Sequence, residues 1–158
     1  MTIYIDMDGV LAKWNSSASI EDTHKRGYFA EREPETKLVS LVNKLRTLGK
    51  HVCVLSAVYQ NGYAAKEKSD WLDKVFDKAL DRIFVPYGHN KSDYIASNND
   101  SVLIDDYSEN LRQWEQSGSV AVKLYNGING TKGTWKGRSI NLDMTVQEMI
   151  DVLSSEQK

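Results

Sequence analysis

The segment that most restricts the fold of this chain is residues 3–12, which read Ile-Tyr-Ile-Asp-Met-Asp-Gly-Val-Leu-Ala. An apolar run leads into two carboxylates at alternate positions, Asp6 and Asp8, and then into Gly9. This pattern predicts a buried strand that ends in a tight turn, with both carboxylates on one face of the strand. Two such carboxylates repel each other unless a cation lies between them or one keeps its proton. The segment therefore predicts a metal-dependent active site; the alternative is a surface turn, where Asp-Gly is common.

A second acidic pair far along the chain favours the active-site interpretation. Residues 102–106, Val-Leu-Ile-Asp-Asp, again form an apolar run that ends in carboxylates, Asp105 and Asp106. Burying charge is costly, but two such strand ends compensate each other if they lie side by side and share a divalent cation. Carboxylate oxygens suit Mg²⁺. The histidines and the single cysteine, Cys53, lack zinc-binding spacing, so we expect Mg²⁺.

Strand-like and helical segments alternate along the 158 residues, which we expect to form a single domain, 1–158. The expected strands are residues 3–5, 51–55, 82–85, 102–105 and 120–124. Helices are expected at 38–48, 71–79, 91–95 and 111–114, and after a capping box formed by Thr145 and Glu148. This order predicts an α/β fold, a three-layer Rossmann-like parallel sheet with helices on both faces. In such sheets ligands bind beyond the carboxyl ends of the strands, where both acidic motifs fall.

Charge and composition exclude several classes of partner. The net charge of −2 and the isoelectric point near 5.9 give no basic stripe for long nucleic acid, so none is expected. No apolar stretch is long enough for a membrane span, so no membrane partner is expected. A single cysteine forms no internal disulfide, which favours a cytoplasmic protein.

Two further polar positions lie next to predicted strand ends. Ser56 and Ala57 close the second strand, where a hydroxyl and backbone amides can hold an anion. Lys91 begins a short segment after the turn at residues 88–90. Taken singly, each has an ordinary explanation, because serine is common in turns and an isolated lysine is usually solvated.

The complete order of motifs is Asp-x-Asp-Gly, then Ser, then Lys, then Asp-Asp, and it resembles the haloacid dehalogenase superfamily of phosphotransferases. Three other segments look like the 5′(3′)-deoxyribonucleotidase branch: Gly27-Tyr28-Phe29-x-x-x-x-Pro34, Glu67-Lys68-x-x-Trp71-Leu72 and Leu103-Ile104-Asp105-Asp106. The resemblance runs over roughly residues 2–125. It implies a small helical cap, residues 13–33, inserted after the first strand.

The resemblance also implies a role for each motif residue. Asp6 would attack phosphorus and form an aspartyl-phosphate, and Asp8 would protonate the leaving alcohol and then deprotonate water. Mg²⁺ would be bound by the Asp6 carboxylate, the Asp8 backbone carbonyl and Asp106, with Asp105 binding through water.

The phosphate oxygens would be held by Ser56, Lys91 and the Ala57 position. Nucleotidases of this branch carry a second hydroxyl residue there, so the backbone of Ala57 would have to supply the contact.

Aromatic residues of the cap are candidates for contact with a nucleobase. Tyr28 and Phe29 match family positions next to the pocket, whereas Trp14 is expected in the small core of the cap. The loop at residues 125–135 either lines the site or is an ordinary surface loop.

We therefore expect a cytoplasmic Mg²⁺-dependent phosphatase whose substrate is a small phosphate ester, a deoxyribonucleoside monophosphate. The alternatives are a phosphatase for a sugar phosphate or a nucleic-acid 3′-phosphate, and a non-catalytic binding module of the same fold. The sequence leaves open the base and sugar preference, the choice between 5′- and 3′-phosphates, and the oligomeric state, with a homodimer as one possible assembly.

Overall fold

The computed structural model describes residues 1–60, 62–77, 79–96, 100–129 and 133–155. The strands are β1 (Thr2–Ile5), β2 (His51–Val58), β3 (Asp81–Pro86), β4 (Ser101–Asp105), β5 (Val120–Tyr125) and β6 (Arg138–Asn141). The helices are α1 (Ile20–Thr23), α2 (Thr36–Thr47), α3 (Ala64–Val75), the 3₁₀ helix η1 (Lys91–Tyr94), α4 (Ser108–Gln116) and α5 (Val146–Ser154). The six strands form one sheet of order β3-β2-β1-β4-β5-β6 in which every neighbouring pair is parallel.

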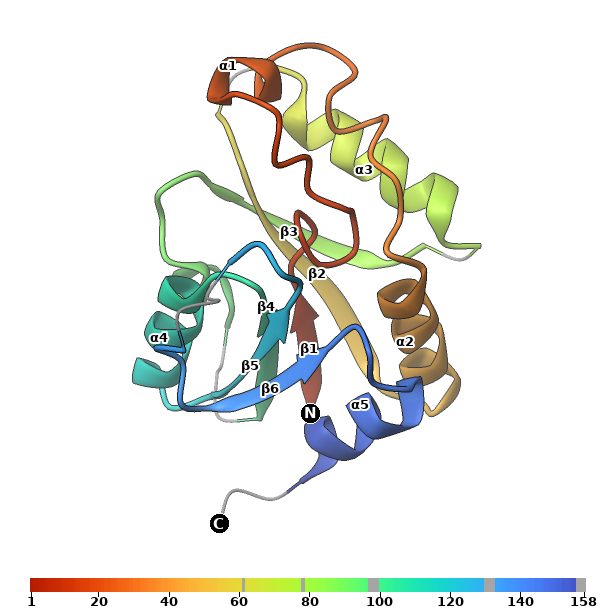
Figure 1. Cartoon of the computed structure of the whole chain (residues 1–158), viewed down its shortest axis with the longest axis vertical. Helices are drawn as coiled ribbons and strands as arrows, with labels where there is room; N and C mark the ends of the chain where they lie inside the picture. Colours follow the sequence, from red (N-terminus) through yellow and green to blue (C-terminus); the bar gives the residue numbers. More distant parts are fainter. Residues whose placement is uncertain (61, 78, 97–99, 130–132, 156–158) are drawn as a thin grey trace.

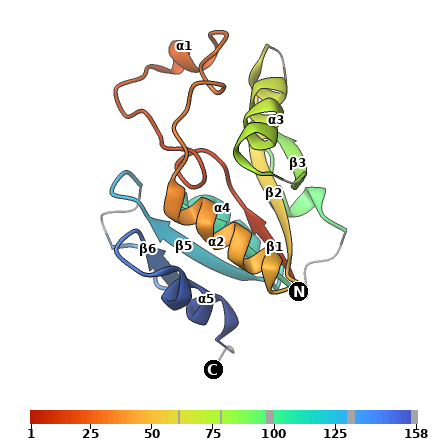
Figure 2. The ribbon, with the colours of Figure 1, turned by 90° about the vertical axis from the view of Figure 1, so that its right-hand side faces the viewer.

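Helices cover both faces of this sheet (Figures 1 and 2). On one face, apolar residues of α2, α3 and α5 form a single core cluster with alternate residues of the strands, among them Ile3, Ile5 and Ile104. On the other face, Leu111 and Trp114 of α4 pack on Leu55 and Leu103. Because both faces are covered, the inner strands β1, β2, β4 and β5 are predominantly apolar. This arrangement confirms the predicted three-layer α/β architecture.

One strand was not predicted from the sequence, and several element boundaries differ from the prediction: β2 extends to Val58, α3 begins at Ala64, and α4 spans Ser108–Gln116. Residues 120–124 are not the last strand, since β6 pairs with β5 at the sheet edge. Its sequence Arg-Ser-Ile-Asn buries only Ile140 fully, so it carries no readable alternation. Helix α3 ends at Val75 with Phe76 as its C-cap. Ala79 is therefore not on the helix but exposed after it.

The strand register places the two acidic motifs next to each other. Ile5 pairs with Ile104, and the backbone N–H of Asp6 donates to the Ile104 carbonyl at 2.9 Å. Asp6 and Asp105 therefore leave neighbouring strands at the same level of the carboxyl edge. The first sequence motif meets the last one because β1 and β4 are adjacent in a parallel sheet.

The segment between β1 and α2 lies over this carboxyl edge, beside α3 (Figures 1 and 2). The Glu67 carboxylate on α3 accepts hydrogen bonds from the backbone N–H groups of Gly27 at 2.6 Å and Phe29 at 3.1 Å. The indole N–H of Trp71 donates to the Arg32 carbonyl at 2.7 Å. Helix α3 thus fixes the position of this segment by hydrogen bonds to its backbone.

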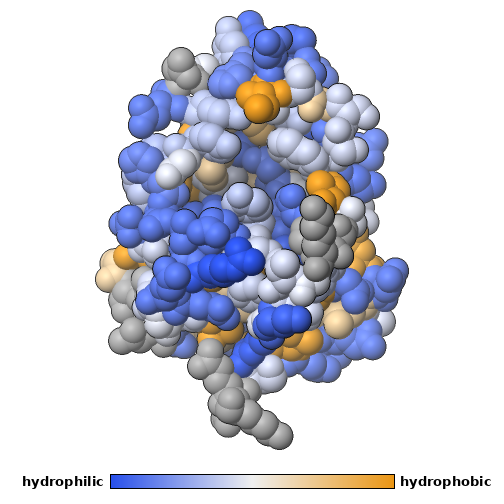
Figure 3. All heavy atoms as spheres, turned by 60° about the vertical axis from the view of Figure 1, so that its left-hand side comes forward, coloured by the Kyte–Doolittle hydropathy of each residue, from blue (hydrophilic) through white to orange (hydrophobic). Residues whose placement is uncertain are grey.

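The surface carries no large apolar region on the face drawn in Figure 3, where hydrophilic residues predominate and hydrophobic ones are scattered. Within the described part of the chain, no helix combines the length and the apolarity needed to cross a membrane.

The predicted capping box of α5 is present and gives a stability test. The Thr145 hydroxyl accepts from the Glu148 N–H at 3.2 Å, and the Glu148 carboxylate accepts from the Thr145 N–H at 2.7 Å. We expect Thr145→Ala to lower the free energy of unfolding by about 1 kcal/mol, measured by urea denaturation. Asn43→Ala, at an exposed position within α2, is the control and should not lower the free energy of unfolding. An equal loss in both variants would contradict the capping role.

Candidate active site

Asp6 lies at the end of β1 with a lysine as its closest charged partner. Its side chain is buried, and its Oδ1 accepts a hydrogen bond from Lys91 Nζ at 2.8 Å. Lys91, the first residue of η1, also donates to Asp105 Oδ2 at 2.7 Å. Burial by itself would lower the pKa of Lys91, but the charges of Asp105 and Asp6 outweigh it and raise the pKa. Lys91 is therefore a permanent buried cation between two carboxylates.

Three buried carboxylates form a cluster at the ends of β1 and β4. Asp6, Asp105 and Asp106 each offer an oxygen, and these oxygens lie within 4.8 Å of one another. Burial, followed by the charges of Asp105 and Asp6, raises the pKa of Asp106 to about 7. Burial also raises the pKa of Asp105, against the opposing effect of Lys91. A cluster of hard oxygen ligands with this excess of negative charge fits a divalent cation such as Mg²⁺.

The two acids that follow β4 differ in how far their oxygens are already occupied. Asp105 Oδ1 accepts from the Tyr107 N–H at 2.8 Å, and its Oδ2 accepts from Asn110 Nδ2 at 2.9 Å as well as from Lys91. Asp106 Oδ2 accepts from two asparagines, whereas its Oδ1 has no hydrogen bond among the described residues. Asp106 therefore has the oxygen that is freer to bind a ligand.

The loop after β5 reaches the acidic cluster. Asn126 Nδ2 donates to Asp106 Oδ2 at 2.9 Å and to the Gly9 carbonyl at 2.7 Å, and Asn129 Nδ2 donates to Asp106 Oδ2 at 2.7 Å. The side chains of Asn126 and Asn129 thus lie at the acidic cluster, as one of the two interpretations of this loop had it. Residues 130–132 of the same predicted loop lie outside the described residues.

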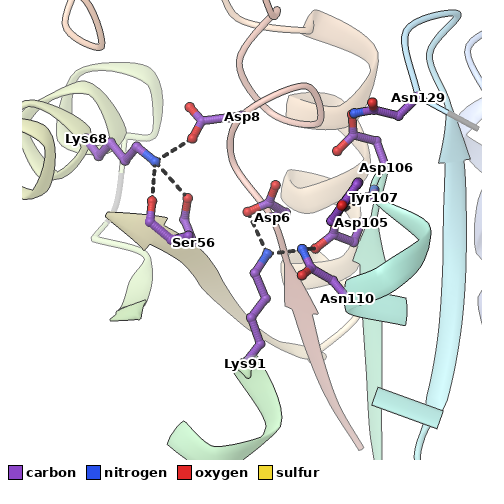
Figure 4. Close-up of polar contacts among 11 residues, drawn as sticks. Asp6, Asp8, Ser56, Lys68, Lys91, Asp105, Asp106, Tyr107, Asn110 and Asn129 are labelled. Atoms are coloured by element: carbon purple, nitrogen blue, oxygen red, sulfur yellow. Dashed lines mark hydrogen bonds and ion pairs between the residues drawn. The ribbon is translucent and has the colours of Figure 1, made fainter. Parts of the chain in front are cut away.

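Asp8 points away from the cluster and toward α3 (Figure 4). Its carboxylate forms an ion pair with Lys68, whose Nζ also donates to Ser56 Oγ at 3.1 Å and to the Ala57 carbonyl at 2.7 Å. Burial raises the pKa of Asp8, and the charge of Lys68 opposes this shift. The two carboxylates of the first motif therefore have different lysines as partners.

The sequence analysis gave no role to Lys68 or to Lys123, and both are buried beside the site. Lys123 Nζ donates to the Asp106 carbonyl at 2.7 Å and to Ser108 Oγ at 2.8 Å. A signal was available for each: Lys68 interrupts the apolar stripe of α3, and Lys123 interrupts the apolar run of β5. A charge at a core position needs a partner, and here the partners are the site residues.

The aromatic residues of the cap, residues 13–33, differ in their burial. Tyr28 and Phe29 are buried in a cluster with Val58 and Ala64, and the Phe29 ring centroid is 4.5 Å from Lys68 Nζ. The Tyr28 hydroxyl is buried with no hydrogen-bond partner among the described residues. Trp14 is 37% exposed, so its assignment to the core of the cap was wrong. A cavity of about 310 Å³ lies in the cap beside Tyr28.

The geometry suits nucleophilic attack on a phosphoryl group. The Asp6 carboxylate belongs to the cluster of three acids that could hold a cation, and Lys91 supplies a fixed positive charge beside it. Ser56 supplies a hydroxyl on β2, the strand next to β1. A carboxylate can approach an anionic ester only where such charges neutralise the oxygens of the ester.

Comparison with known families supports this chemistry. The model of the family described as 5′ nucleotidase, deoxy (pyrimidine), cytosolic type C protein matches residues 17–131, which is more than two thirds of the chain. The match begins after Asp6 and Asp8, so the roles of these two residues depend on the geometry. A search of curated proteins gives no match.

Several solved structures have a similar fold. D,D-heptose 1,7-bisphosphate phosphatase from B. bronchiseptica, complexed with magnesium and phosphate, has a TM-score of 0.67 and 12% identity over 95% of this chain and 98% of that chain. The D,D-heptose 1,7-bisphosphate phosphatase from Burkholderia thailandensis has a TM-score of 0.66 and 13% identity over 98% and 99%. A haloacid dehalogenase-like hydrolase from Streptococcus pneumoniae has a TM-score of 0.66 and 11% identity over 97% of this chain and 98% of that chain. The predicted haloacid dehalogenase-like fold is confirmed.

The close packing of the first turn on Asp106 gives a second test. Gly9 has a φ of +77°, and a Cβ at this residue would lie 2.6 Å from Asp106 Oδ2. We expect Gly9→Ala to lower the free energy of unfolding by about 1 kcal/mol more than Gly49→Ala, because overpacking adds to backbone strain. Gly49 has a similar φ of +73° with open space around the position of a Cβ, so it isolates the strain. Equal losses in urea denaturation would show that the contact with Asp106 is unimportant.

Proposed function

The chain belongs to the family of cytosolic type C 5′ nucleotidases (deoxy, pyrimidine) and is a phosphatase; on this premise we propose that it hydrolyses deoxyribonucleoside monophosphates with Mg²⁺ through an aspartyl-phosphate. The observation that carries the proposal is the buried Asp6 carboxylate, paired with Lys91 inside the cluster of Asp6, Asp105 and Asp106. The proposed nucleophile Asp6, the cation of Lys91 and the proposed metal ligands therefore lie next to one another.

The described residues fit the cation that this chemistry needs. Asp6, the Asp8 backbone carbonyl and Asp106 would hold Mg²⁺, and Asp105, whose oxygens are already hydrogen-bonded, would bind it through water. When bound, Mg²⁺ would draw negative charge from the phosphate oxygens and lower the repulsion between the ester and the attacking carboxylate.

The first half of the proposed reaction uses the two acids of the first motif in different ways. An Asp6 oxygen attacks phosphorus, the P–O bond to the alcohol breaks, and Asp8 donates its proton to the departing oxygen. Lys91, the Ser56 hydroxyl and the backbone at Ala57 hold the phosphate oxygens during this step. The raised pKa of Asp8, which burial causes, favours the protonated form that the step requires.

The second half returns the enzyme to its starting state. Water attacks the phosphorus of the aspartyl-phosphate, Asp8 takes the proton of that water, and inorganic phosphate leaves with the Asp6 carboxylate restored. One pocket serves both displacements, because the same groups hold the phosphoryl oxygens throughout.

The nucleoside part of the substrate would lie under the cap, residues 13–33. Tyr28 and Phe29 are the proposed contacts of the base, and they belong to the segment that α3 holds by hydrogen bonds. The family description supports a cytoplasmic setting and a pyrimidine deoxynucleotide. A homodimer is compatible with this proposal and is not required by it.

Phosphate release from a panel of substrates tests the proposal. The panel contains deoxy- and ribonucleoside monophosphates with 5′- and 3′-phosphates, sugar phosphates and a 3′-phosphorylated oligonucleotide. We expect preference for deoxynucleotides and loss of at least about a thousandfold in kcat for Asp6→Asn, which keeps the shape of the side chain and removes the nucleophile. Asp151→Asn, an exposed acid on α5, should keep full activity. Turnover of sugar phosphates or the oligonucleotide alone would overturn the substrate and keep the mechanism.

Metal removal gives a separate prediction. Chelation should abolish activity and added Mg²⁺ should restore it. We expect Asp106→Asn to raise the Mg²⁺ concentration for half-maximal activity by roughly tenfold or more, because it removes a proposed ligand. Asp151→Asn should leave that concentration unchanged. Full activity after exhaustive chelation would contradict the proposed cofactor.

A further inference from the structure

Lys68 is a buried cation that is held entirely by residues of the proposed active site. The residue is 1% exposed and lies in the middle of α3. Its ammonium group has three protons, and the structure gives it three acceptors: the Asp8 carboxylate, Ser56 Oγ and the Ala57 carbonyl. With every donor used, Lys68 has none left for a phosphate oxygen. Its effect on the reaction must therefore pass through the groups that it holds.

The first of these groups is the Asp8 carboxylate. Asp6 and Asp8 are two residues apart, yet Asp6 is paired with Lys91 and Asp8 with Lys68 (Figure 4). This pairing turns the Asp8 carboxylate away from the cluster of Asp6, Asp105 and Asp106 and toward α3. In the proposed reaction this is the side on which the alcohol leaves, so the Asp8 carboxyl group can donate its proton there.

The second group is the Ser56 hydroxyl. A hydroxyl has one proton and two lone pairs, and Lys68 Nζ occupies a lone pair of Ser56 Oγ at 3.1 Å. The proton of Ser56 is then free to be donated to a bound anion. The same ammonium donates to the Ala57 carbonyl at 2.7 Å and so fixes the backbone that follows Ser56.

The frame around Lys68 is rigid. Its neighbour Glu67 holds the backbone of Gly27 and Phe29, and the Phe29 ring lies against the Lys68 ammonium at 4.5 Å. One helical turn further, Trp71 is hydrogen-bonded to Arg32. The ammonium position is therefore set by contacts of α3 on both sides.

We propose that Lys68 is a positioning residue of the phosphatase reaction, which aims the Asp8 carboxyl group at the leaving oxygen and the Ser56 hydroxyl at the phosphoryl group. The proposal rests on the proposed function for the roles of Asp8 and Ser56. It assigns no contact between Lys68 and the substrate.

The leaving group of the substrate separates this role from a merely structural one. A nucleoside alkoxide is a poor leaving group and needs the proton that Asp8 donates. The p-nitrophenolate ion leaves readily without a proton, so hydrolysis of p-nitrophenyl phosphate depends little on the position of Asp8. General loss of structure, in contrast, would lower the turnover of both esters by the same factor.

The experiment compares Lys68→Met with Lys66→Met on deoxynucleoside monophosphate and on p-nitrophenyl phosphate. Lys66 is exposed on the same helix and pairs only with Asp70 in the described structure, so it is the matched control. We expect Lys68→Met to lower kcat for the nucleotide by about 10- to 100-fold and kcat for the aryl ester by less than about threefold. KM should rise for both esters, because Ser56 acts on the shared phosphoryl group. Lys66→Met should match the wild type.

Two further variants test whether Lys68 acts through Asp8. In an Asp8→Asn background, Lys68→Met should cause no further loss of kcat for the nucleotide, because effects through one group are not additive. Lys68→Arg, with a planar guanidinium, should not restore the nucleotide activity. Equal losses on both esters, or independent effects of Lys68 and Asp8, would overturn the proposal, and thermal unfolding identifies variants that fail to fold.

The activity of the wild-type protein alone decides whether the proposed substrate is correct. If the wild type hydrolyses the aryl ester p-nitrophenyl phosphate and an alkyl phosphate such as a sugar phosphate, but no nucleotide, the proposed substrate fails. The role of Lys68 is then decided with the best alkyl phosphate in place of the nucleotide.

Discussion

The structure depends on the neutralisation of four carboxylates that meet at the ends of two adjacent buried strands. Asp6 and Asp8 follow β1, and Asp105 and Asp106 end and follow β4. Charges in such a position are costly unless they are paired. Three buried lysines satisfy this requirement in part: Lys91 pairs with Asp6 and Asp105, Lys68 pairs with Asp8, and Lys123 binds the Asp106 carbonyl. Asp106 keeps an oxygen free of hydrogen bonds among the described residues, which is where a divalent cation would complete the balance.

Each of the three lysines comes from a different part of the chain and contacts a different acidic residue of the site. Lys91 begins η1 beyond β3, Lys68 is in α3, and Lys123 is in β5. Because each acid has a different partner, two chemically identical carboxylates, Asp6 and Asp8, acquire different surroundings and can serve as nucleophile and as proton donor. The same helix that carries Lys68 also holds the cap through Glu67. The segment of residues 13–33 and the carboxylate of Asp8 are therefore positioned by the same helix, α3.

Prediction from the sequence succeeds where the structure of a segment depends on residues that are near one another in the chain. The apolar runs before Asp6 and Asp105 and the alternation of strands and helices were sufficient to predict a parallel sheet with both acidic motifs at its carboxyl edge. The capping box of Thr145 was likewise sufficient to predict the start of α5. It failed for β6, whose four residues have a single fully buried side chain, Ile140, and whose existence depends on pairing with β5. It also failed for Trp14 and Ala79, because a helical or apolar pattern does not state where an element ends or what covers it.

The sequence by itself determined the α/β class and the two acidic motifs, and it provided the residues proposed to bind a phosphate and a cation. Only the tertiary structure decided which lysine pairs with which carboxylate, and it brought Lys68 and Asn126 into the site. The reason is physical: strand patterns are set by neighbours two residues apart, whereas the Lys68–Asp8 pair joins residues 60 positions apart and the Asn126–Gly9 bond joins residues 117 apart. Contacts at such separations depend on the register of β1 against β2 and β4, which no local pattern encodes.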